Sequence, residues 1–405
     1  MPSSRGPVTR VAAPRHLPTD SPNDPPNEVP RHELCPVQAA CGGCPLLPLG
    51  DAVRAEQCCD ALQRALGGAG LEPPEPRWHA APEPLRYRNR LRLAVGDGGE
   101  PRFFNAAKAA DCAVVSESVL DGIEVLRAAA RAVPAGLMAF SHLELRGKDA
   151  LGRWGLRCAP REPGVREHPV LSALGAEWLV GVAPGSVPSV VPTMPCQRFD
   201  VTDGCYLEVP LDAFLQVNSA VNRMLVSHVV SGLRERGARS FADLYMGAGN
   251  FALPLLDAGL LGWGAERHVG AVVAARRAAS EQGLLGAAQA CEHFSAGDAL
   301  TAADAWAQRG VRLDAVVLDP PRAGLGVRAP IATGLGARWL VLCSCHTEGL
   351  AADVSRLVAE GFAIQAVEAF DMFPQTRHVE SVVWLERRRS GPVGGLPRVP
   401  DAATR

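Results

Sequence analysis

The stretch DLYMGAGNFALPL, residues 243–255, carries the strongest indication of the fold. An apolar strand ends in Asp243, the turn Gly247-Ala248-Gly249 follows, and an apolar helical segment begins after the turn. Glycines at such a turn let the backbone approach a ligand closely. Because a strand, a glycine turn and a helix in this order are typical of cofactor sites, the sequence predicts one here.

Two classes of cofactor fit this turn. The dinucleotide fingerprint has a third glycine where Ala252 stands, a replacement that some variants permit. One strand later, GAER offers Glu266 at a position where an acid can accept hydrogen bonds from ribose hydroxyl groups. The shape of the motif favours S-adenosylmethionine over a dinucleotide, and the turn alone leaves both open.

Strands and helices alternate from residue 214 onward. The segment NSAVNRMLVSHVVSGLRERG has the spacing of an amphipathic helix, with Asn218 or Ser219 as its N-cap. The predicted strands are FADLY, GWGAE, LDAVVLD, RWLVLCS and VESVVWLERR. This alternation predicts an α/β fold with a largely parallel, doubly wound sheet, in which ligands bind beyond the carboxyl ends of the strands.

Differences in composition and in predicted secondary structure divide the chain into five predicted segments. Residues 1–34 are proline-rich and predict a disordered leader, not a secretory signal. Residues 35–75 combine a cysteine group with a short helical stretch. Residues 76–213 form a β-rich central region with one hairpin, YRNRLRLAV-GDGG-PRFF, and one helix, SESVLDGIEVLRAAARAV. Residues 214–389 form the α/β domain, and residues 390–405 a loose tail.

The composition excludes some classes of protein. No apolar run approaches the roughly 20 residues that span a bilayer, so we expect no membrane segment and a cytoplasmic location. Twelve cysteines without a secretory signal indicate metal-binding or catalytic thiols and no disulfide framework. The net charge of −2 neither suggests nor excludes a nucleic-acid partner. No obligate protein partner is predicted.

A second chemistry-bearing segment is VVLDPPRAGLG, residues 316–326. A strand that ends in an acid and two prolines cannot continue into a regular helix, so Asp319 is held in a rigid, exposed turn. Such acid-Pro-Pro turns occur beside the reacting base in methyltransferases that modify nucleobases. An ordinary strand-to-helix loop is the alternative.

The segment VLCSCHTEGLAADV, residues 341–354, offers two thiols on one face of a strand. Cys343 lies within the apolar run, which predicts a buried core thiol. Cys345 lies at the rim, before a helix start at His346-Thr347 that is expected to lower the thiol pKa. One intervening residue is a poor match for a zinc-binding pair. Locally, Cys345 is either a nucleophile or a structural thiol.

A loop in DMFPQTRHVESVVWL ends in Glu380, a carboxylate that is either a general base or simply solvated. Taken together, AFLQVN, DLYMGAGNF, LDPPRAGL, SCHTEGLAADV and DMFPQTRHVE resemble the motifs of the RNA uracil-C5 methyltransferase family, in family order. The resemblance covers residues 35–388. One departure is His346-Thr347, where the family usually has Asn-Pro. The resemblance implies a Rossmann-like domain that methylates uracil C5 in RNA with S-adenosylmethionine.

The resemblance also implies roles for individual residues. Cys345 matches the thiolate that adds to uracil C6, and Glu380 matches the general base that removes the C5 proton. The target base is expected to be flipped out of its stack. The residues that match the family's contacts with the cofactor, or lie near it, are Gln216, Tyr245, Asn250, Glu266, Asp298 and Asp319.

Four further cysteines form a pattern of their own. CPVQAACGGC gives Cys35, Cys41 and Cys44, with Cys112 far downstream. The spacing does not match a zinc ribbon, whereas four thiolates suit an iron–sulfur cluster. Several members of the resembled family carry a [4Fe-4S] cluster at these positions. The resemblance therefore implies a structural cluster that joins the small N-terminal region to the β-rich region.

The expected partner is RNA. Alternation in RYRNRLRL predicts Arg86, Arg88, Arg90 and Arg92 on one strand face, which could follow a phosphate backbone or simply be solvated. Many relatives begin with a β-barrel, and only 34 residues precede the first cluster cysteine here. A cluster without that barrel resembles a 23S rRNA branch, with tRNA as the second candidate. A catalytically silent RNA-binding iron–sulfur protein is a third, and Ser344 before Cys345 disfavours DNA cytosine methylation.

Overall fold

A computed structural model of the protein describes most of the chain. The described residues are 35, 38–102, 112–162, 165, 167–183 and 194–388. The predicted leader (1–34) and tail (390–405) lie outside them. No helix in this part of the chain combines the length and the apolar composition that crossing a bilayer requires.

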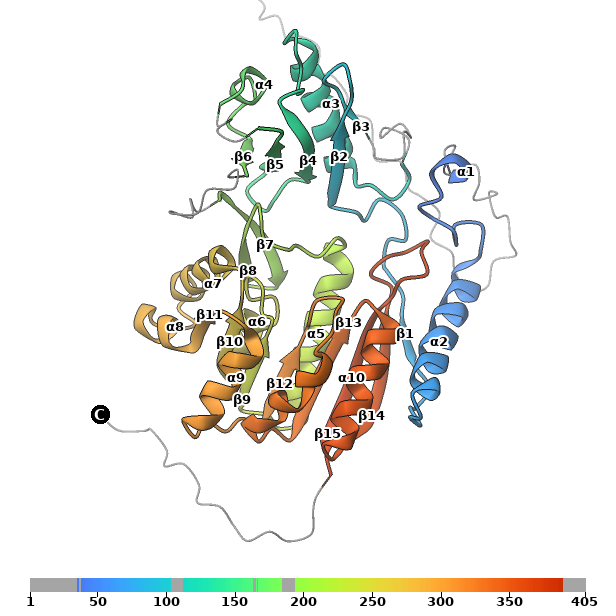
Figure 1. The fold of residues 1–405 in the computed structure, drawn as a ribbon, viewed down its shortest axis with the longest axis vertical. Helices are drawn as coiled ribbons and strands as arrows, with labels where there is room; N and C mark the ends of the chain where they lie inside the picture. The colour runs from blue at the N-terminus through green and yellow to red at the C-terminus, as the bar shows by residue number, and fades with distance from the viewer. Residues whose placement is uncertain are drawn as a thin grey trace, which may run out of the picture.

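An eight-stranded sheet forms the larger part of the molecule, in the order β1-β14-β15-β13-β12-β9-β10-β11 (Figure 1). Its strands are β1 (Arg77–His79), β9 (Ser240–Leu244), β10 (Leu261–Glu266), β11 (Phe294–Ala296), β12 (Ala315–Leu318), β13 (Trp339–Ser344), β14 (Phe362–Phe370) and β15 (Glu380–Arg387). Only β15 runs antiparallel to its neighbours in this sheet. The predicted, largely parallel sheet is therefore confirmed.

Helices cover both faces of this sheet. One face packs against α5 (Ser219–Glu235), α6 (Ala252–Asp257), α7 (Val269–Glu281) and α8 (Ala287–His293). The other face packs against α2 (Asp51–Gly68), α9 (Ala299–Gln308), α10 (Thr347–Ala359) and the 3-10 segment η3 (Gly326–Leu335). Side chains alternate along β12, with Val317 facing the first layer and Val316 the second. This arrangement is the predicted doubly wound α/β architecture.

The helix α5 begins where its sequence predicts. The Asn218 side chain accepts a hydrogen bond from the backbone N–H of Val221 at 3.2 Å, so Asn218 is the N-cap. Leu225, Val229 and Leu233 repeat at four-residue spacing and are fully buried against the sheet. The polar N-terminus of α5 thereby points toward the carboxyl edge of the sheet (Figure 1).

A five-stranded sheet, in the order β3-β2-β4-β5-β6, lies above the larger one in Figure 1. Its strands are β2 (Arg90–Val95), β3 (Pro101–Arg102), β4 (Phe140–Arg146), β5 (Trp154–Pro160) and β6 (Trp178–Val182). The helices α3 (Glu117–Arg131) and α4 (Pro169–Ser172) accompany it, and β7 (Cys196–Thr202) pairs with β8 (Cys205–Pro210). The predicted hairpin is confirmed where Val95 pairs with Pro101; its residues 103–104 lie outside the described part.

The N-terminal segment is joined to the larger sheet. After the short α1 (Gln38–Cys41), α2 buries Leu62 and Leu66 in the core under the sheet. It lies beside β1 at the sheet edge in Figure 1. The Arg54 guanidinium donates to the Asp371 carboxylate at 2.6 Å, with both side chains 2% exposed. The division at residue 75 stays a prediction, although β1 pairs with β14 and so belongs to the larger sheet.

Candidate active site

The candidate site lies where β9, β12 and β13 end and β15 begins. The strand order reverses between β9 and β12: the chain continues from β9 to β10 and β11 on one side, then crosses to β12. Ligands of open α/β sheets bind at such a switch point, outside the carboxyl ends of the strands. The segments singled out in the sequence at Asp243, Asp319 and Cys345 all follow or end these strands.

The glycine turn after β9 is held by a buried carboxyl group. Asp243 is fully buried, and its Oδ2 accepts a hydrogen bond from the backbone N–H of Ala252 at 2.9 Å, which ties the end of β9 to the start of α6. Gly249 has a φ of 96°, and a Cβ there would lie 2.8 Å from the Leu253 Cγ. Because an added side chain would be strained and would clash, this position requires glycine.

Glu266 supports the same turn from the end of β10. Its Oε2 accepts from the Gly247 N–H at 3.2 Å, and its Oε1 accepts from the His268 N–H at 2.7 Å. A carboxylate with two backbone donors is fixed in place, and each oxygen keeps a lone pair for a ligand. Glu266 does not itself line the pocket described next.

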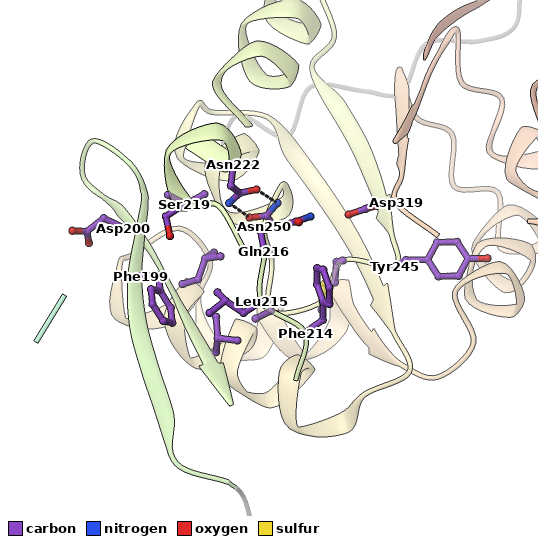
Figure 2. Close-up of a pocket in the computed structure, with 16 residues that line it drawn as sticks. Phe199, Asp200, Phe214, Leu215, Gln216, Ser219, Asn222, Tyr245, Asn250 and Asp319 are labelled. Carbon is purple, nitrogen blue, oxygen red and sulfur yellow. Dashed lines mark hydrogen bonds between the residues drawn. The ribbon is translucent and has the colours of Figure 1, made fainter. Parts of the chain in front are cut away.

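A pocket of about 620 Å³, open to solvent, lies between the glycine turn, β7, β8 and the start of α5. Of the predicted cofactor residues, Gln216, Tyr245, Asn250 and Asp319 line it (Figure 2). The Tyr245 backbone has a φ of 72°, and Figure 2 shows its ring directed away from Asn250. The pocket thus gathers residues from five separate segments at the switch point: 199–201, 207–209, 214–222, 245–250 and Asp319.

The sequence analysis missed two residues of this pocket. Asn222, buried on α5, donates from its Nδ2 to the Asn250 Oδ1 at 2.8 Å, and Asn250 donates back at 3.0 Å (Figure 2). Phe214, at the pocket wall, is 62% exposed, and its ring faces the Arg90 guanidinium at 5.2 Å. Asn222 follows the cap Asn218 by one helical turn, so a polar residue on the apolar face of the helix was the available signal.

Asp298 lies outside the pocket lining. It is the N-cap of α9, where its Oδ1 accepts from the Thr301 N–H at 2.9 Å. It also forms ion pairs with Arg328 at 2.8 Å and with Arg267 at 3.0 Å. The Arg328 hydrogen bond is the main reason that the pKa of Asp298 lies well below its usual range, so this carboxylate is ionised and already paired.

The two proposed reactive residues lie at neighbouring strand ends. In the antiparallel ladder between β13 and β15 the last pair is Ser344 with Ser381. Cys345 follows this last pair directly after β13, and Glu380, the first residue of β15 and the partner of Phe370 in β14, comes directly before it. The charge of Glu380 acts on the Cys345 thiol, so the two groups lie near each other. Cys343, two residues earlier, is fully buried in the core, as predicted.

Two carboxyl groups, Glu380 and Asp319, lie near the Cys345 thiol and act on it electrostatically. Burial raises the pKa of Asp319 to about 7. Burial, and then the charge of Asp319, raises the pKa of Glu380 well above its usual range. The same two causes, in the same order, act on Asp243. The charge of Asp319 thus raises the pKa of both Glu380 and Asp243, and carboxyl groups with raised pKa values are suited to general acid–base roles.

The expectation that a helix N-terminus lowers the pKa of Cys345 is wrong. The helix α10 does follow, with the His346 Nδ1 accepting from the Gly349 N–H at 3.2 Å. Burial, and then the nearby Glu380, nevertheless raise the thiol pKa, and a hydrogen bond with Arg322 opposes them without reversing the shift. Desolvation and a like charge therefore decide the direction of the Cys345 pKa shift.

The four cysteines of the predicted cluster lie together, in the described residues, away from the catalytic edge. Burial, and then the charges of Cys112, Cys35 and Cys41, raise the pKa of the Cys44 thiol to about 11. Cys35 packs with Ala113, beside Cys112, in one small apolar group. Sequence segments 68 residues apart, at Cys44 and Cys112, are thus brought to one place.

Hydrogen bonds connect this cysteine region to the catalytic edge. The Leu46 N–H donates to the Gln375 carbonyl at 3.1 Å, and the Tyr87 hydroxyl donates to the Pro374 carbonyl at 3.0 Å. Both acceptors lie in the loop that leads to Glu380. On the other side, the Asn89 Nδ2 donates to the carbonyl of Gln216, in the pocket wall, at 3.0 Å.

The predicted row of four arginines is wrong in part. The strand begins only at Arg90, and Arg86 has a φ of 55° that interrupts any alternation before it. The Arg86 Nη1 donates to the Cys112 carbonyl at 2.8 Å, so this guanidinium holds the cysteine region instead of facing solvent. Arg92 is the exposed member of the row. Positive φ in a non-glycine residue is a tertiary effect that strand alternation does not reveal.

The strand order with one reversed strand, the glycine turn and the pocket beside it define a Rossmann-like methyltransferase domain. A solved structure with this fold, the Pyrococcus abyssi tRNA (uracil-54, C5)-methyltransferase in complex with S-adenosyl-L-homocysteine, matches this chain with a TM-score of 0.64. The match covers 85% of each chain at 22% sequence identity. At this identity the similarity establishes the shared fold.

The chain belongs to the RNA uracil-C5 methyltransferase family. The family model described as tRNA (Uracil-5-)-methyltransferase matches residues 298–388. The 23S rRNA (uracil(1939)-C(5))-methyltransferase RlmD of Pseudomonas aeruginosa (strain UCBPP-PA14) is 32% identical over 380 residues, which are 88% of this chain and 80% of the relative. The protein of the same name from Azoarcus sp. (strain BH72) is 30% identical, over 87% of this chain and 85% of the relative. The predicted family is confirmed.

Proposed function

We propose that this protein transfers the methyl group of S-adenosylmethionine to C5 of a uridine in 23S rRNA. The observation that carries the proposal is the pairing of β13 with β15, whose adjoining ends are followed by Cys345 and begun by Glu380, near Asp319. A thiol and a carboxyl group at adjoining strand ends match the two steps that methylation of uracil C5 requires, and Asp319 links them to the pocket that it lines. The relatives named as 23S rRNA methyltransferases support the RNA class.

The pocket of Figure 2 is the proposed cofactor site. Asn250, oriented by its paired hydrogen bonds with Asn222, presents its amide to the ligand, and Gln216 and Asp319 line the side toward the thiol. Glu266 and Tyr245 would contact the ribose and adenine parts. Asp298 is the weakest of the predicted contacts because two arginines already occupy its carboxylate.

The bound cofactor supplies an electrophilic methyl group. Cys345 Sγ, as the thiolate, forms a bond with uracil C6, and the electron pair displaced from the C5–C6 double bond makes C5 nucleophilic. Once C5 carries the methyl group, the Glu380 carboxylate removes the C5 proton. The electron pair of that C–H bond restores the double bond and breaks the Sγ–C6 bond, so the thiolate is regenerated.

The raised pKa values of the two acids and of the thiol affect the order in which these groups lose their protons. Burial makes Glu380 and Asp319 hold protons more readily than ordinary carboxyl groups. The Arg322 hydrogen bond favours the charged form of Cys345 and is the interaction available to stabilise the thiolate as it forms. A cationic cofactor beside Asp319 would favour ionised carboxyl groups and so prepare Glu380 to act as a base.

The four cysteines fit a [4Fe-4S] cluster. As thiolates, these four groups would repel one another. Bound iron would neutralise their negative charge and remove the repulsion. Four thiolates around one zinc ion, at Zn–S about 2.3 Å, lie roughly 3.8 Å apart. Among the described residues, no three of these sulfur atoms lie within 4.8 Å of one another, and this wider spacing favours a cluster over a single ion. Held there, a cluster would brace the loop that carries Glu380.

The test combines anaerobically purified protein with labelled S-adenosylmethionine and separated, unmodified 23S rRNA and tRNA. Formation of 5-methyluridine in 23S rRNA is the expected result. Methylation of tRNA alone would replace the proposed substrate with the second candidate, which the Pyrococcus abyssi fold relative favours. A lack of product in both pools, with RNA still bound, would support the catalytically silent alternative.

Variants assign the thiol. Cys345→Ala is expected to abolish both product and covalent adduct with RNA. Cys291→Ala, which removes an exposed thiol far from the site, is the matched control and should behave as the wild type. If the adduct survives in Cys345→Ala but disappears in Cys343→Ala, the assignment of the nucleophile is wrong.

A further inference from the structure

Three potential metal ligands lie together outside the site described so far. His79 is the last residue of β1, Glu368 is in β14, and His228 is in the middle of α5. Their ligand atoms all lie within 4.8 Å of one another, and no other such set of three histidine, cysteine or acidic residues occurs in the described residues. The chain brings them together from positions far apart in sequence, at the edge where α5 crosses β14 and β1.

The geometry directs both imidazoles at one carboxylate. The His79 Nε2 lies 2.5 Å from the Glu368 Oε2, and the His228 Nε2 lies 3.4 Å from the Glu368 Oε1. The His228 Nε2 makes no hydrogen bond within the described part of the chain, although it is shielded from solvent. The His228 Nε2 is thus a buried nitrogen that faces a carboxylate but makes no hydrogen bond to it. Such a nitrogen is available to bind a ligand.

Neighbouring rings fix the orientation of these ligands. The His79 ring stacks on Phe370 with centroids 4.1 Å apart and planes 4° from parallel. The His228 ring meets Trp384 edge-on at 5.9 Å. The ring contacts hold both imidazoles in place beside the carboxylate, so the three side chains are preorganised, as metal ligands require.

We propose that His79, His228 and Glu368 bind one divalent transition-metal ion, with zinc as the best fit. Two histidines and one glutamate are a donor set that zinc uses. Ligand atoms of a tetrahedral zinc site, at about 2.0–2.1 Å from the ion, lie roughly 3.3 Å apart. The His228–Glu368 distance of 3.4 Å already matches this spacing, and His79 has to withdraw from its contact with Glu368 at 2.5 Å.

The ion would act as a structural clamp. It would join α5, whose first turns carry Asn218 and Asn222, to β14 and to the short edge strand β1. Glu368 pairs with Val382, two residues from Glu380 on the same face of β15, so the clamp lies beneath the catalytic edge and does not form part of it. This inference does not depend on the proposed RNA substrate.

The experiment titrates the anaerobically purified full chain, with its cysteine region intact, with Co²⁺ and then with Zn²⁺. Thiolates also bind these ions, so the readout is the difference between proteins and not the absolute stoichiometry. The wild type should retain one equivalent of Co²⁺ more than His228→Asn, with affinity lowered more than about 100-fold in the variant, because even outer partners of a ligand cost 10–100-fold. Visible absorption bands of imidazole-bound Co²⁺ should disappear with that equivalent.

Two further variants make the outcome decisive. His79→Gln keeps an N–H donor for Glu368 but is a poor zinc ligand, so it should fold and lose the same equivalent. His142→Asn removes a histidine of β4 in the smaller sheet and should behave as the wild type. Zn²⁺ should raise the thermal midpoint of the wild type and His142→Asn only. Equal metal content and equal thermal response in the wild type, His228→Asn and His79→Gln would overturn the proposal and leave a hydrogen-bonded ion group.

Discussion

Substituting Glu380 with glutamine separates the proposed chemistry from the stability of the fold. The Glu380 side chain is almost fully buried, and burial together with the charge of Asp319 raises its pKa well above the usual range. The resting carboxyl group therefore holds its proton more readily than an ordinary one, and glutamine replaces it with a neutral group of nearly the same shape. We expect the free energy of unfolding to change by no more than about 1 kcal/mol, the net value of one hydrogen bond.

Turnover should respond quite differently. A positioned general base contributes about 10²–10⁴-fold to a proton transfer. At 1.36 kcal/mol per tenfold, Glu380→Gln should raise the barrier for release of the C5 proton by about 2.7–5.4 kcal/mol. Because Cys345 adds and the methyl group is transferred before that step, each protein molecule should complete one methylation and then remain attached to the RNA.

The assay follows one turnover with RNA and cofactor labelled separately. In Glu380→Gln the two labels should comigrate with the protein on a denaturing gel, in about one equivalent, whereas Cys345→Ala should show neither. Unfolding by denaturant checks that both variants are folded. A folded Glu380→Gln that releases methylated RNA at a rate within tenfold of the wild type would refute the role of Glu380 as the base.

Three other predictions follow from the structure. Since Glu380 and Asp319 both have raised pKa values, release of methylated RNA in a single turnover should accelerate with pH over a range above that of an ordinary carboxyl group, and Asp319→Asn should move that rise to lower pH. Arg54→Leu leaves the Asp371 carboxylate buried and unpaired, so denaturant unfolding should show a loss of about 3–5 kcal/mol, largely recovered by adding Asp371→Asn. Cys112→Ser should abolish bound iron and its visible absorption in anaerobic preparations, while wild type prepared in parallel retains both.

Local sequence signals predicted the parts of the fold that depend on local physics. The cap at Asn218, the hairpin around Val95 and the burial of Cys343 follow from a capping side chain, a glycine-rich turn and an apolar run. The strand β1 was not predicted, because three residues are too few for a period to appear and its pairing with β14 is set by tertiary contacts. The same limit applies to the pair Arg54 and Asp371, whose members lie 317 positions apart.

The candidate site, too, could be predicted from the sequence only in part. The resemblance of motifs predicted which residues gather at the carboxyl edge, and Gln216, Asn250 and Asp319 do line one pocket. The pKa of Cys345 could not be predicted from its place before a helix, because the shift is decided by burial and by a carboxyl group 35 residues later in the chain. Electrostatics of this kind depends on the sum of three-dimensional surroundings, which spacing does not encode.

The reversed strand β15 has a consequence for the order in which the enzyme becomes competent during its synthesis. It is the last strand of the described chain, yet it lies inside the sheet, between β14 and β13. Chains emerge from the ribosome N-terminus first. The strand β13, which leads to Cys345, is therefore made before β15, its neighbour in the sheet. A nascent chain therefore holds the proposed nucleophile Cys345 without the proposed base Glu380, and its sheet is incomplete. Insertion of this one late strand would complete the core and the proposed reaction centre together, and would so couple the onset of catalysis to the end of folding.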